Sequence, residues 1–417
     1  MAYNAPMSPL IEKHTGLYTD LYELTMVQGY FLSKTHETPA AFDYFFREDP
    51  FKGGYVIFSG LQDLMEVLED FRYSEEDLDY LQGLGFFQPA FLDYLRSFRF
   101  QGRLFAMREG EVVFPLEPLL RAEGTLLETQ LIETLVLNFL NFESLIATKA
   151  SRMVVAARGR RVVDFGLRRA QGLAGIQASR AAFVGGVEGT SNVYSALKFG
   201  LPPSGTQAHS WIQSYPDELT AFRRFAEIYP KQCILLVDTY NTLKSGVPNA
   251  ITVAKEMEAK GEKMVGIRLD SGDLAYLSKH ARAMLDNAGL HYVKIVVSNQ
   301  LDEHLIKSLL DQGAPINAFG VGTNLVTGQD SPALDGVYKL SLLGGTPRLK
   351  ISENPIKTSL PGLKKVIRYS DADGIFYADG VALEDEKTLE YIHHPLYPEQ
   401  KSRVAPYFPE SMLFKVM

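Results

Sequence analysis

The sequence predicts an α/β protein whose main part is a parallel (β/α) barrel, with a second, smaller mixed α+β domain. From about residue 160 to residue 345, apolar runs of roughly six residues alternate with helical patterns, as in parallel strands joined by crossovers. Before and after this region the chain instead has short alternating strands between Gly and Pro turns. The number of strand–helix repeats favours a barrel over an open sheet, although periodicity alone does not separate the two.

The repeating region accounts for most of the expected elements. Apolar runs predict strands at 161–166, 181–186, 233–238, 263–270, 292–298, 316–322 and 336–343. Helical patterns follow at 191–200, 247–261, 273–289 and 301–313. The long apolar stretch at 125–148 is interrupted by Glu128, Glu133 and Glu143, so we expect a buried amphipathic helix and not a membrane span.

The flanking segments predict the second domain. Residues 19–33 have helical spacing with Asp20 as a candidate N-cap, 39–49 and 53–60 read as strands, and 100–123 reads as short strands. Residues 346–417 read as an antiparallel sheet with a hairpin turn at "DADG". We therefore expect a discontinuous mixed domain at 1–124 and 346–417, and the barrel domain at 125–345.

Composition excludes several classes of protein. The 417 residues carry a net charge of −8, which argues against a nucleic-acid surface. The single cysteine, Cys233, excludes a disulfide framework and a Cys-rich zinc site. The first residues, "MAYNAPMSPL", lack the basic and apolar parts of a signal peptide. These observations predict a cytoplasmic protein with no nucleic-acid or membrane partner.

Polar residues follow nearly every expected strand of the barrel, and active sites of such barrels lie at these carboxyl ends. A helix cap explains any single one of them, but not a set that combines arginine, aspartate, serine, threonine and glycine. The set comprises Phe165, Arg168, Gly189, Thr190, Ser191, Asp238, Arg268, Asp270, Ser271, Gly272, Ser298, Asn299, Gly320, Gly322 and Thr323.

The residue types in this set suit a phosphorylated sugar. Gly and Thr at strand-to-helix turns expose N–H groups that bind phosphate. Arg168 and Arg268 can pair with phosphate or carboxylate oxygens, and Asp238 and Asp270 can accept ribose hydroxyls or hold Mg²⁺ through water. The segment "GVGTNLVTG" has the wrong spacing for a dinucleotide fingerprint.

One histidine stands out from every periodic pattern. His209 follows the small-residue stretch "SGTQA" in the segment "SGTQAHSW", in a loop between two expected strands. On these residues alone two interpretations remain open: a surface histidine, or an imidazole placed to meet a small charged group.

Seven segments in order resemble nicotinate phosphoribosyltransferases: "LYTDLYELTMVQGYF", "DFGLRRAQG", "GTSNV", "GTQAHSW", "LLVDTYNTLKSGVPNAI", "RLDSGDL" and "FGVGTNL". The resemblance covers about residues 15–345. It implies an irregular α/β barrel beside a smaller mixed domain, and a homodimer whose active sites are shared. It also implies ATP-coupled transfer of phosphoribosyl from phosphoribosyl pyrophosphate to nicotinate in NAD salvage, with ATP as co-substrate and Mg²⁺ as cofactor.

The resemblance also implies roles for individual residues. His209 is expected to be phosphorylated by ATP and Asp238 to orient it. Phe165 is expected to stack on one face of the pyridine ring, and Tyr22 of the partner subunit on the other, with Asp20 nearby. The remaining expected ligand-binding residues are Arg168 at the nicotinate carboxylate or the adjacent phosphate, Arg268 and Asp270 at phosphoribosyl groups and ribose hydroxyls, and Gly320, Gly322 and Thr323 at the 5′-phosphate. Thr190, Ser191 and Ser298 are also expected to bind substrate.

Some positions bear on specificity and on rival functions. Relatives that use nicotinamide have Asp where this chain has Ser191. We therefore expect the pyridine substrate to be nicotinate and not nicotinamide. Asn241 and Gln300 depart from acidic residues that are frequent in relatives, which puts a charge role there in doubt. The alternatives are a nicotinamide-using transferase, a sugar-phosphate barrel enzyme with Lys244 or Lys339 as a Schiff-base candidate, and a non-catalytic phosphate-binding protein.

Overall fold

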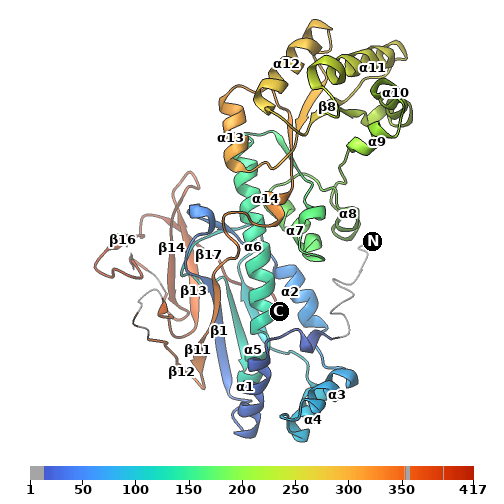
Figure 1. Ribbon diagram of the computed structural model, residues 1–417. Coiled ribbons are helices and arrows are strands. Elements are labelled where there is room, and N and C mark those ends of the chain that lie inside the picture. Colours follow the sequence, from blue (N-terminus) through green and yellow to red (C-terminus); the bar gives the residue numbers. More distant parts are fainter. Residues whose placement is uncertain (1–13, 352, 354–356, 388) are drawn as a thin grey trace. The chain divides into compact units, whose positions relative to one another are not determined.

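The computed structural model describes residues 14–417 apart from 352, 354–356 and 388 (Figure 1). The chain forms two compact units. We call Lys149–Pro332 the central unit, and Met1–Thr148 together with Ala333–Met417 the terminal unit.

The central unit alternates strands with helices, as the sequence predicts. Its elements are, in chain order, the last part of α6 (Glu133–Ala156), β6 (Arg161–Asp164), η3 (Leu167–Arg169), α7 (Ala174–Val184), α8 (Val193–Phe199), α9 (His209–Gln213), α10 (Glu218–Ile228), η4 (Pro230–Gln232), β7 (Ile234–Leu236), η5 (Thr242–Gly246), α11 (Val247–Ala259), β8 (Gly266–Leu269), α12 (Leu274–Asn287), β9 (Lys294–Val297), α13 (Glu303–Asp311), β10 (Ala318–Val321) and α14 (Thr323–Val326).

The strands of the central unit form one parallel sheet in the order β6-β10-β9-β8-β7. Isolated parallel bridges extend the pairing beyond β6, from Asp164 to Thr190 and from Thr190 to Pro203. Since all the strands run the same way, their carboxyl ends meet along one edge of the sheet. That edge brings together residues distant in the sequence.

One expected strand of this unit is wrong. Residues 181–186 belong to the end of α7 and to the turn after it. Ala178, Ala181 and Ala182 form a small buried face of this helix, and alanine favours helix more than strand. The segment that pairs beside β6 is the irregular stretch around Thr190.

The terminal unit is mostly antiparallel, with helices from its N-terminal part. Its elements are η1 (Thr15–Leu17), α1 (Leu21–Leu32), β1 (Pro39–Phe46), η2 (Pro50–Lys52), β2 (Val56–Ile57), α2 (Leu61–Glu69), α3 (Glu75–Gly83), α4 (Pro89–Ser97), β3 (Arg103–Ala106), β4 (Val112–Val113), β5 (Leu120–Thr125), α5 (Leu126–Leu131), most of α6, β11 (Gly336–Leu343), β12 (Thr346–Pro347), β13 (Lys364–Ser370), β14 (Phe376–Leu383), β15 (Tyr391–His393), β16 (Lys401–Arg403), β17 (Phe408–Ser411) and β18 (Phe414–Lys415).

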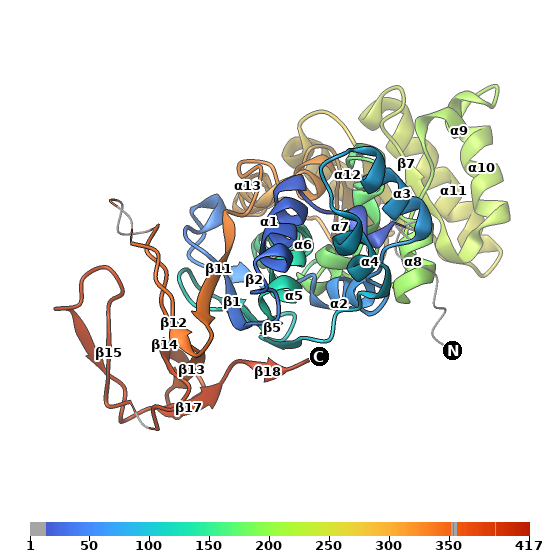
Figure 2. The ribbon, with the colours of Figure 1, turned by 90° about the horizontal axis from the view of Figure 1, so that it is seen from below.

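Two larger sheets organise the terminal unit. One has the order β12-β11-β1-β5-β3-β18, and the other has the order β14-β13-β17. Figure 2 shows β13, β14 and β17 together at the lower left, with β18 between them and the C-terminus. The turn at 371–374 joins β13 to β14 as a hairpin, as the sequence predicts.

The unit boundaries differ from the expected divisions after residues 124 and 345. The division within α6 follows Thr148 because Leu127, Leu135 and Phe139 are buried in the core of the terminal unit. The second division precedes Gly336–Leu343, because β11 pairs antiparallel with β1. An apolar run read as a barrel strand is therefore a strand of the other unit.

Two further observations concern burial and membranes. Cys233 is a buried core residue, and burial raises the pKa of its thiol to about 12. Among the described residues, none of the helices is both long enough and apolar enough to cross a membrane.

Candidate active site

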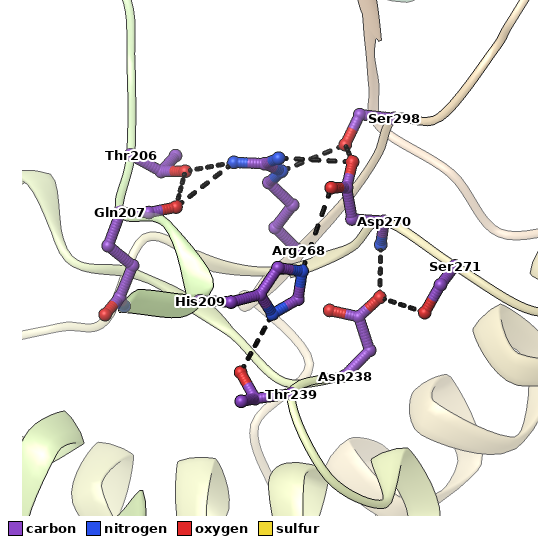
Figure 3. Close-up of polar contacts among 9 residues, drawn as sticks. All are labelled: Thr206, Gln207, His209, Asp238, Thr239, Arg268, Asp270, Ser271 and Ser298. Carbon is purple, nitrogen blue, oxygen red and sulfur yellow. Dashed lines mark hydrogen bonds and ion pairs between the residues drawn. The ribbon is translucent and has the colours of Figure 1, made fainter. Parts of the chain in front are cut away.

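Arg268 is the centre of a polar network at the carboxyl edge of the central sheet (Figure 3). Its Nε donates to Ser298 Oγ at 2.9 Å, its Nη1 donates to Thr206 Oγ1 at 2.9 Å, and its Nη2 lies 3.1 Å from Asp270 Oδ1. The guanidinium is largely buried, with 13% of the side chain exposed. Each nitrogen therefore has a separate partner, which fixes the plane of the cation.

Asp270 is held from two sides. Ser298 Oγ donates a short hydrogen bond to the same Oδ1 that pairs with Arg268. The backbone N–H of Asp270 donates to Asp238 Oδ2 at 2.8 Å, and Ser271 Oγ donates to that oxygen at 2.6 Å. The Asp238 side chain, after β7, is thus tied to the backbone of Asp270, after β8.

His209 is the first residue of α9, with 42% of its side chain exposed. Its Nδ1 lies 3.0 Å from Thr239 Oγ1, and its Nε2 lies 3.9 Å from Asp270 Oδ2. The described residues show no hydrogen bond between Asp238 and His209: Asp238 Oδ2 accepts from Asp270 N and Ser271 Oγ, and its buried Oδ1 has no hydrogen-bond partner. The hydroxyl one residue later in the sequence contacts the imidazole instead.

Phe165 lies beside Arg268, and the Arg268 Cζ is 5.6 Å from its ring centroid, within cation–π range. Gly320 on β10 makes room for this ring, since a Cβ there would lie 2.5 Å from it. The backbone N–H of Phe165 donates to Val321 O at 2.6 Å. Gly320, which was expected to bind the 5′-phosphate, is therefore also needed for the packing of the Phe165 ring.

Thr190 also has a role that differs from the expected one. Its side chain is buried, and its hydroxyl donates to Asp164 Oδ2 at 2.7 Å. Ser179 Oγ donates to the same carboxylate oxygen, and Gly166 N donates to the other. Thr190 thus shapes the strand ends from inside, whereas the neighbouring Ser191 is half-buried.

The loop after β9 is conformationally unusual. Asn299 and Gln300 have φ values of 95° and 44°, in the region that L residues rarely adopt. Asn324 Nδ2 donates to Gln300 O at 2.7 Å and so holds the loop. Backbone strain of this kind clusters at functional sites. The two strained residues directly follow the buried Ser298.

Thr323 begins the short helix α14, directly after Gly322. The position of Gly322 is close to the backbone of Phe165, since a Cβ on it would lie 3.3 Å from Phe165 O. Both residues follow β10, which lies between β6 and β9 in the sheet. The loop expected to bind the 5′-phosphate is thus on the same edge as Arg268.

Other expected site residues form none of the contacts given above for the Arg268 network. Arg168 is exposed in η3, directly after the end of β6. Asp20 and Tyr22 belong to the terminal unit, where Asp20 is the N-cap of α1 without a side-chain capping bond and Tyr22 is 46% exposed. Asn241 caps η5, with its Oδ1 accepting from Lys244 N at 2.8 Å.

The residues missed by sequence reasoning are mostly hydroxyls. Thr206, Thr239 and Asp164 carry polar contacts of the site, and they lie within three residues of His209, Asp238 and Phe165 respectively. A useful signal was available, because each of them follows an apolar strand or precedes the histidine within a few residues.

The segment that bears Asp20 and Tyr22 is anchored by a buried acid, Glu23. Its Oε1 accepts from Thr134 N at 2.9 Å, and its Oε2 accepts from Thr19 Oγ1 at 2.8 Å. Burial raises the pKa of the Glu23 carboxyl from 4.5 to about 7, although these hydrogen bonds oppose the shift. Folding therefore shifts the Glu23 carboxyl toward its protonated form.

Glu23→Gln is expected to reduce the dependence of stability on pH. A carboxyl whose pKa rises on folding stabilises the fold below its unfolded pKa and loses that contribution as pH rises through the folded pKa of about 7. Between about pH 5 and about pH 8, the wild type should lose on the order of 2 kcal/mol more unfolding free energy than the variant. Denaturant unfolding at both pH values measures this difference, with the exposed Glu37→Gln as control.

Comparisons with known proteins find similarity along most of the chain. Residues 17–141 match the model for the nicotinate phosphoribosyltransferase (NAPRTase) N-terminal domain, and residues 160–396 match the model for the nicotinate phosphoribosyltransferase (NAPRTase) family. The chain is 46% identical over 392 residues to a nicotinate phosphoribosyltransferase of Bacillus subtilis, covering 91% of this chain and 79% of the relative.

Two further comparisons extend the similarity. A nicotinate phosphoribosyltransferase of Mycobacterium tuberculosis is 47% identical over 371 residues, covering 88% of this chain and 79% of the relative. The crystal structure of human nicotinic acid phosphoribosyltransferase matches with a TM-score of 0.84 at 31% identity, covering 96% of this chain and 89% of the human chain.

Proposed function

The chain belongs to the nicotinate phosphoribosyltransferase family, and from this premise we propose that its central unit carries an ATP-coupled transfer. The chain transfers the 5-phosphoribosyl group of phosphoribosyl pyrophosphate to nicotinate, giving nicotinate mononucleotide and pyrophosphate in NAD salvage. The observation that carries the assignment to this site is the Arg268–Asp270–Ser298 network facing His209.

The transfer reaction needs a fixed cation and an ordered sugar. The pyridine nitrogen attacks the anomeric carbon while the bond from that carbon to pyrophosphate breaks, and the leaving pyrophosphate takes the electron pair. Arg268 supplies a positive charge whose orientation is set before the reaction, which stabilises developing negative charge. Asp270 is the acceptor available for ribose hydroxyls, and Phe165 offers a ring face to the base.

We assign the coupling to ATP to His209. A hydrogen bond from Nδ1–H to Thr239 Oγ1 leaves the Nε2 lone pair free to attack the γ-phosphorus of ATP. The N–P bond forms as the bond to the ADP oxygen breaks, and the phosphorylated imidazole lies on the side of Asp270. The added negative charge changes how pyrophosphate and its counter-ions are held.

Thr239→Val is expected to weaken the ATP stimulation of turnover by about tenfold, because the imidazole loses the hydroxyl that fixes its tautomer. Thr239→Ser keeps a hydroxyl and should stay within about twofold of wild type. Steady-state rates with and without ATP across a pH series measure this effect, and the pH profile should shift only in the valine variant.

The exposed Thr252→Val on α11 is the matched control for this series. Equal ATP stimulation in the valine and serine variants would remove Thr239 from the mechanism.

Mg²⁺ fits the donor chemistry of this site. Asp238 Oδ1 is buried without a hydrogen-bond partner, Asp270 provides a second carboxylate, and hard oxygen ligands suit this cation. When bound with the phosphates, Mg²⁺ supplies charge neutralisation of the leaving pyrophosphate. Arg268 and Ser298 keep the Asp270 carboxylate in place.

We infer that the central sheet closes into an irregular barrel. The bridges carry the pairing from β6 through Thr190 to Pro203. Four residues later, Gln207 Nε2 donates to Ile234 O at 3.3 Å, at the start of the opposite edge strand β7. One short segment therefore contacts both edges of the sheet.

The proposed assembly is a homodimer that shares its active sites. The first helix, α1, exposes a row of large apolar side chains, which are Leu21, Tyr22, Met26 and Leu32. Exposed apolar patches of this kind are typical of interfaces. In this assembly Asp20 and Tyr22 of the partner subunit complete the nicotinate pocket.

The test of the proposed function is turnover of nicotinate and of nicotinamide with phosphoribosyl pyrophosphate and Mg²⁺, each with and without ATP. We expect mononucleotide from nicotinate, stimulated by ATP, and little from nicotinamide, since Ser191 offers no carboxylate to the amide. Preference for nicotinamide would support the alternative transferase, and no mononucleotide from either base would contradict the assignment.

A further inference from the structure

A hollow lies at the amino-terminal ends of β6, β10 and β9, the edge of the central sheet opposite to Arg268. Its volume is about 730 Å³. It is formed by the turn before β6, by α12 and the loop before β9, and by the loop before β10. The lining residues are Arg158, Gly159, Arg160, Arg161, Arg282, His291, Tyr292, Val293, Lys294, Pro315, Ile316 and Asn317.

The hollow is strongly cationic in a chain whose net charge is −8. Four arginines and one lysine line it, and none of the described lining residues is a carboxylate. Three of the arginines pair with acids outside the lining: Arg158 with Asp311, Arg282 with Asp286 at 2.7 Å, and Arg161 with Glu188 at 3.9 Å.

Two cations of the hollow have no acidic partner among the described residues of the central unit. Arg160 donates only to backbone carbonyls, from Nε to Ile316 O at 2.9 Å and from Nη1 to Ala157 O at 3.4 Å. Those bonds fix the guanidinium without neutralising it. Lys294, at the start of β9, is exposed and forms no ion pair there.

We propose that this hollow is a second anion site, which binds a small phosphorylated molecule through Arg160 and Lys294. Its volume is in the range of about 300–1,000 Å³ typical of small-molecule pockets. Phosphate oxygens suit arginine forks and lysine point charges alike. The net negative charge of the chain disfavours a long nucleic acid, so the ligand is a free molecule, either inorganic pyrophosphate or a nucleotide.

The experiment measures pyrophosphate and ATP binding by equilibrium dialysis. The Arg268→Gln chain serves as the background, because loss of the guanidinium is expected to weaken pyrophosphate binding at the proposed active site. We expect this chain still to bind about one pyrophosphate, and Arg160→Gln/Lys294→Gln in the same background to weaken that binding by at least about tenfold. Lys279→Glu on α12 lies outside the lining and should change binding by less than about twofold.

Two further measurements keep the proposal open to refutation. Lys294→Glu alone changes only an exposed side chain, so it should fold normally and still weaken binding. The double variant without Arg268→Gln should keep its transferase activity, which separates this site from the proposed catalytic function. If pyrophosphate and ATP bind the hollow with equal affinity, the site recognises the phosphate chain alone. If ATP binds more tightly than pyrophosphate, the site recognises a nucleotide. Absent binding, or binding unchanged by both sets of variants, would overturn the proposal.

Discussion

His209→Ala is expected to remove the stimulation of mononucleotide formation by ATP while leaving a slow, ATP-independent transfer. Arg268, Asp270 and Ser298 contact one another without the imidazole, so the transfer site itself should persist. If ATP stimulates the wild type by about a hundredfold, the variant should respond by less than about twofold, a loss of roughly 2–3 kcal/mol of coupling.

Steady-state rates of nicotinate mononucleotide and ADP formation measure this effect together. His304→Ala, on the exposed face of α13, is the matched control and should behave as wild type. An alanine variant that still responds fully to ATP would show that ATP acts without this imidazole.

Arg268→Lys is expected to lower kcat/KM for phosphoribosyl pyrophosphate by about 10²–10³-fold. The guanidinium contacts Ser298, Thr206 and Asp270 through three different nitrogens, and an ammonium cannot reach all three. The substitution keeps the charge, so the loss measures the geometry of the fork.

Initial-rate kinetics with varied phosphoribosyl pyrophosphate separate the loss in kcat from the loss in KM. Arg223→Lys is the matched control, because that arginine forms a fork with Glu256 on the exposed surface. If Arg268→Lys retained kcat/KM within about threefold, charge alone would account for this residue.

Strand–helix alternation could be predicted well, because buried strands and crossover helices leave strong periodic signals. Residues 161–166, 263–270 and 316–322 contain β6, β8 and β10. The run at 181–186 was misread because alanine and glycine carry little periodic information. The apolar run at 336–343 was a strand, but which sheet it joins depends on pairing with β1, which no local pattern contains.

The sequence predicts which residues lie at the site better than it predicts which of their atoms contact one another. Parallel strands bring their carboxyl ends together, so Arg268, Asp270 and Ser298 were expected on one edge. Which oxygen accepts which hydrogen depends on side-chain rotamers and loop paths. Thus Thr239, and not Asp238, contacts His209, and Thr190 is turned inward to Asp164.

The most direct test of the ATP-coupling mechanism is to find where the γ-phosphoryl group of ATP goes. The protein is incubated with ATP labelled at the γ-phosphorus, and the bound phosphoryl group is mapped by peptide mass spectrometry under alkaline conditions. The mechanism predicts an acid-labile phosphoryl group on His209, absent from His209→Ala and released when nicotinate and phosphoribosyl pyrophosphate are added. A phosphoryl group on another residue, or ATP-stimulated turnover with none on His209, would contradict it.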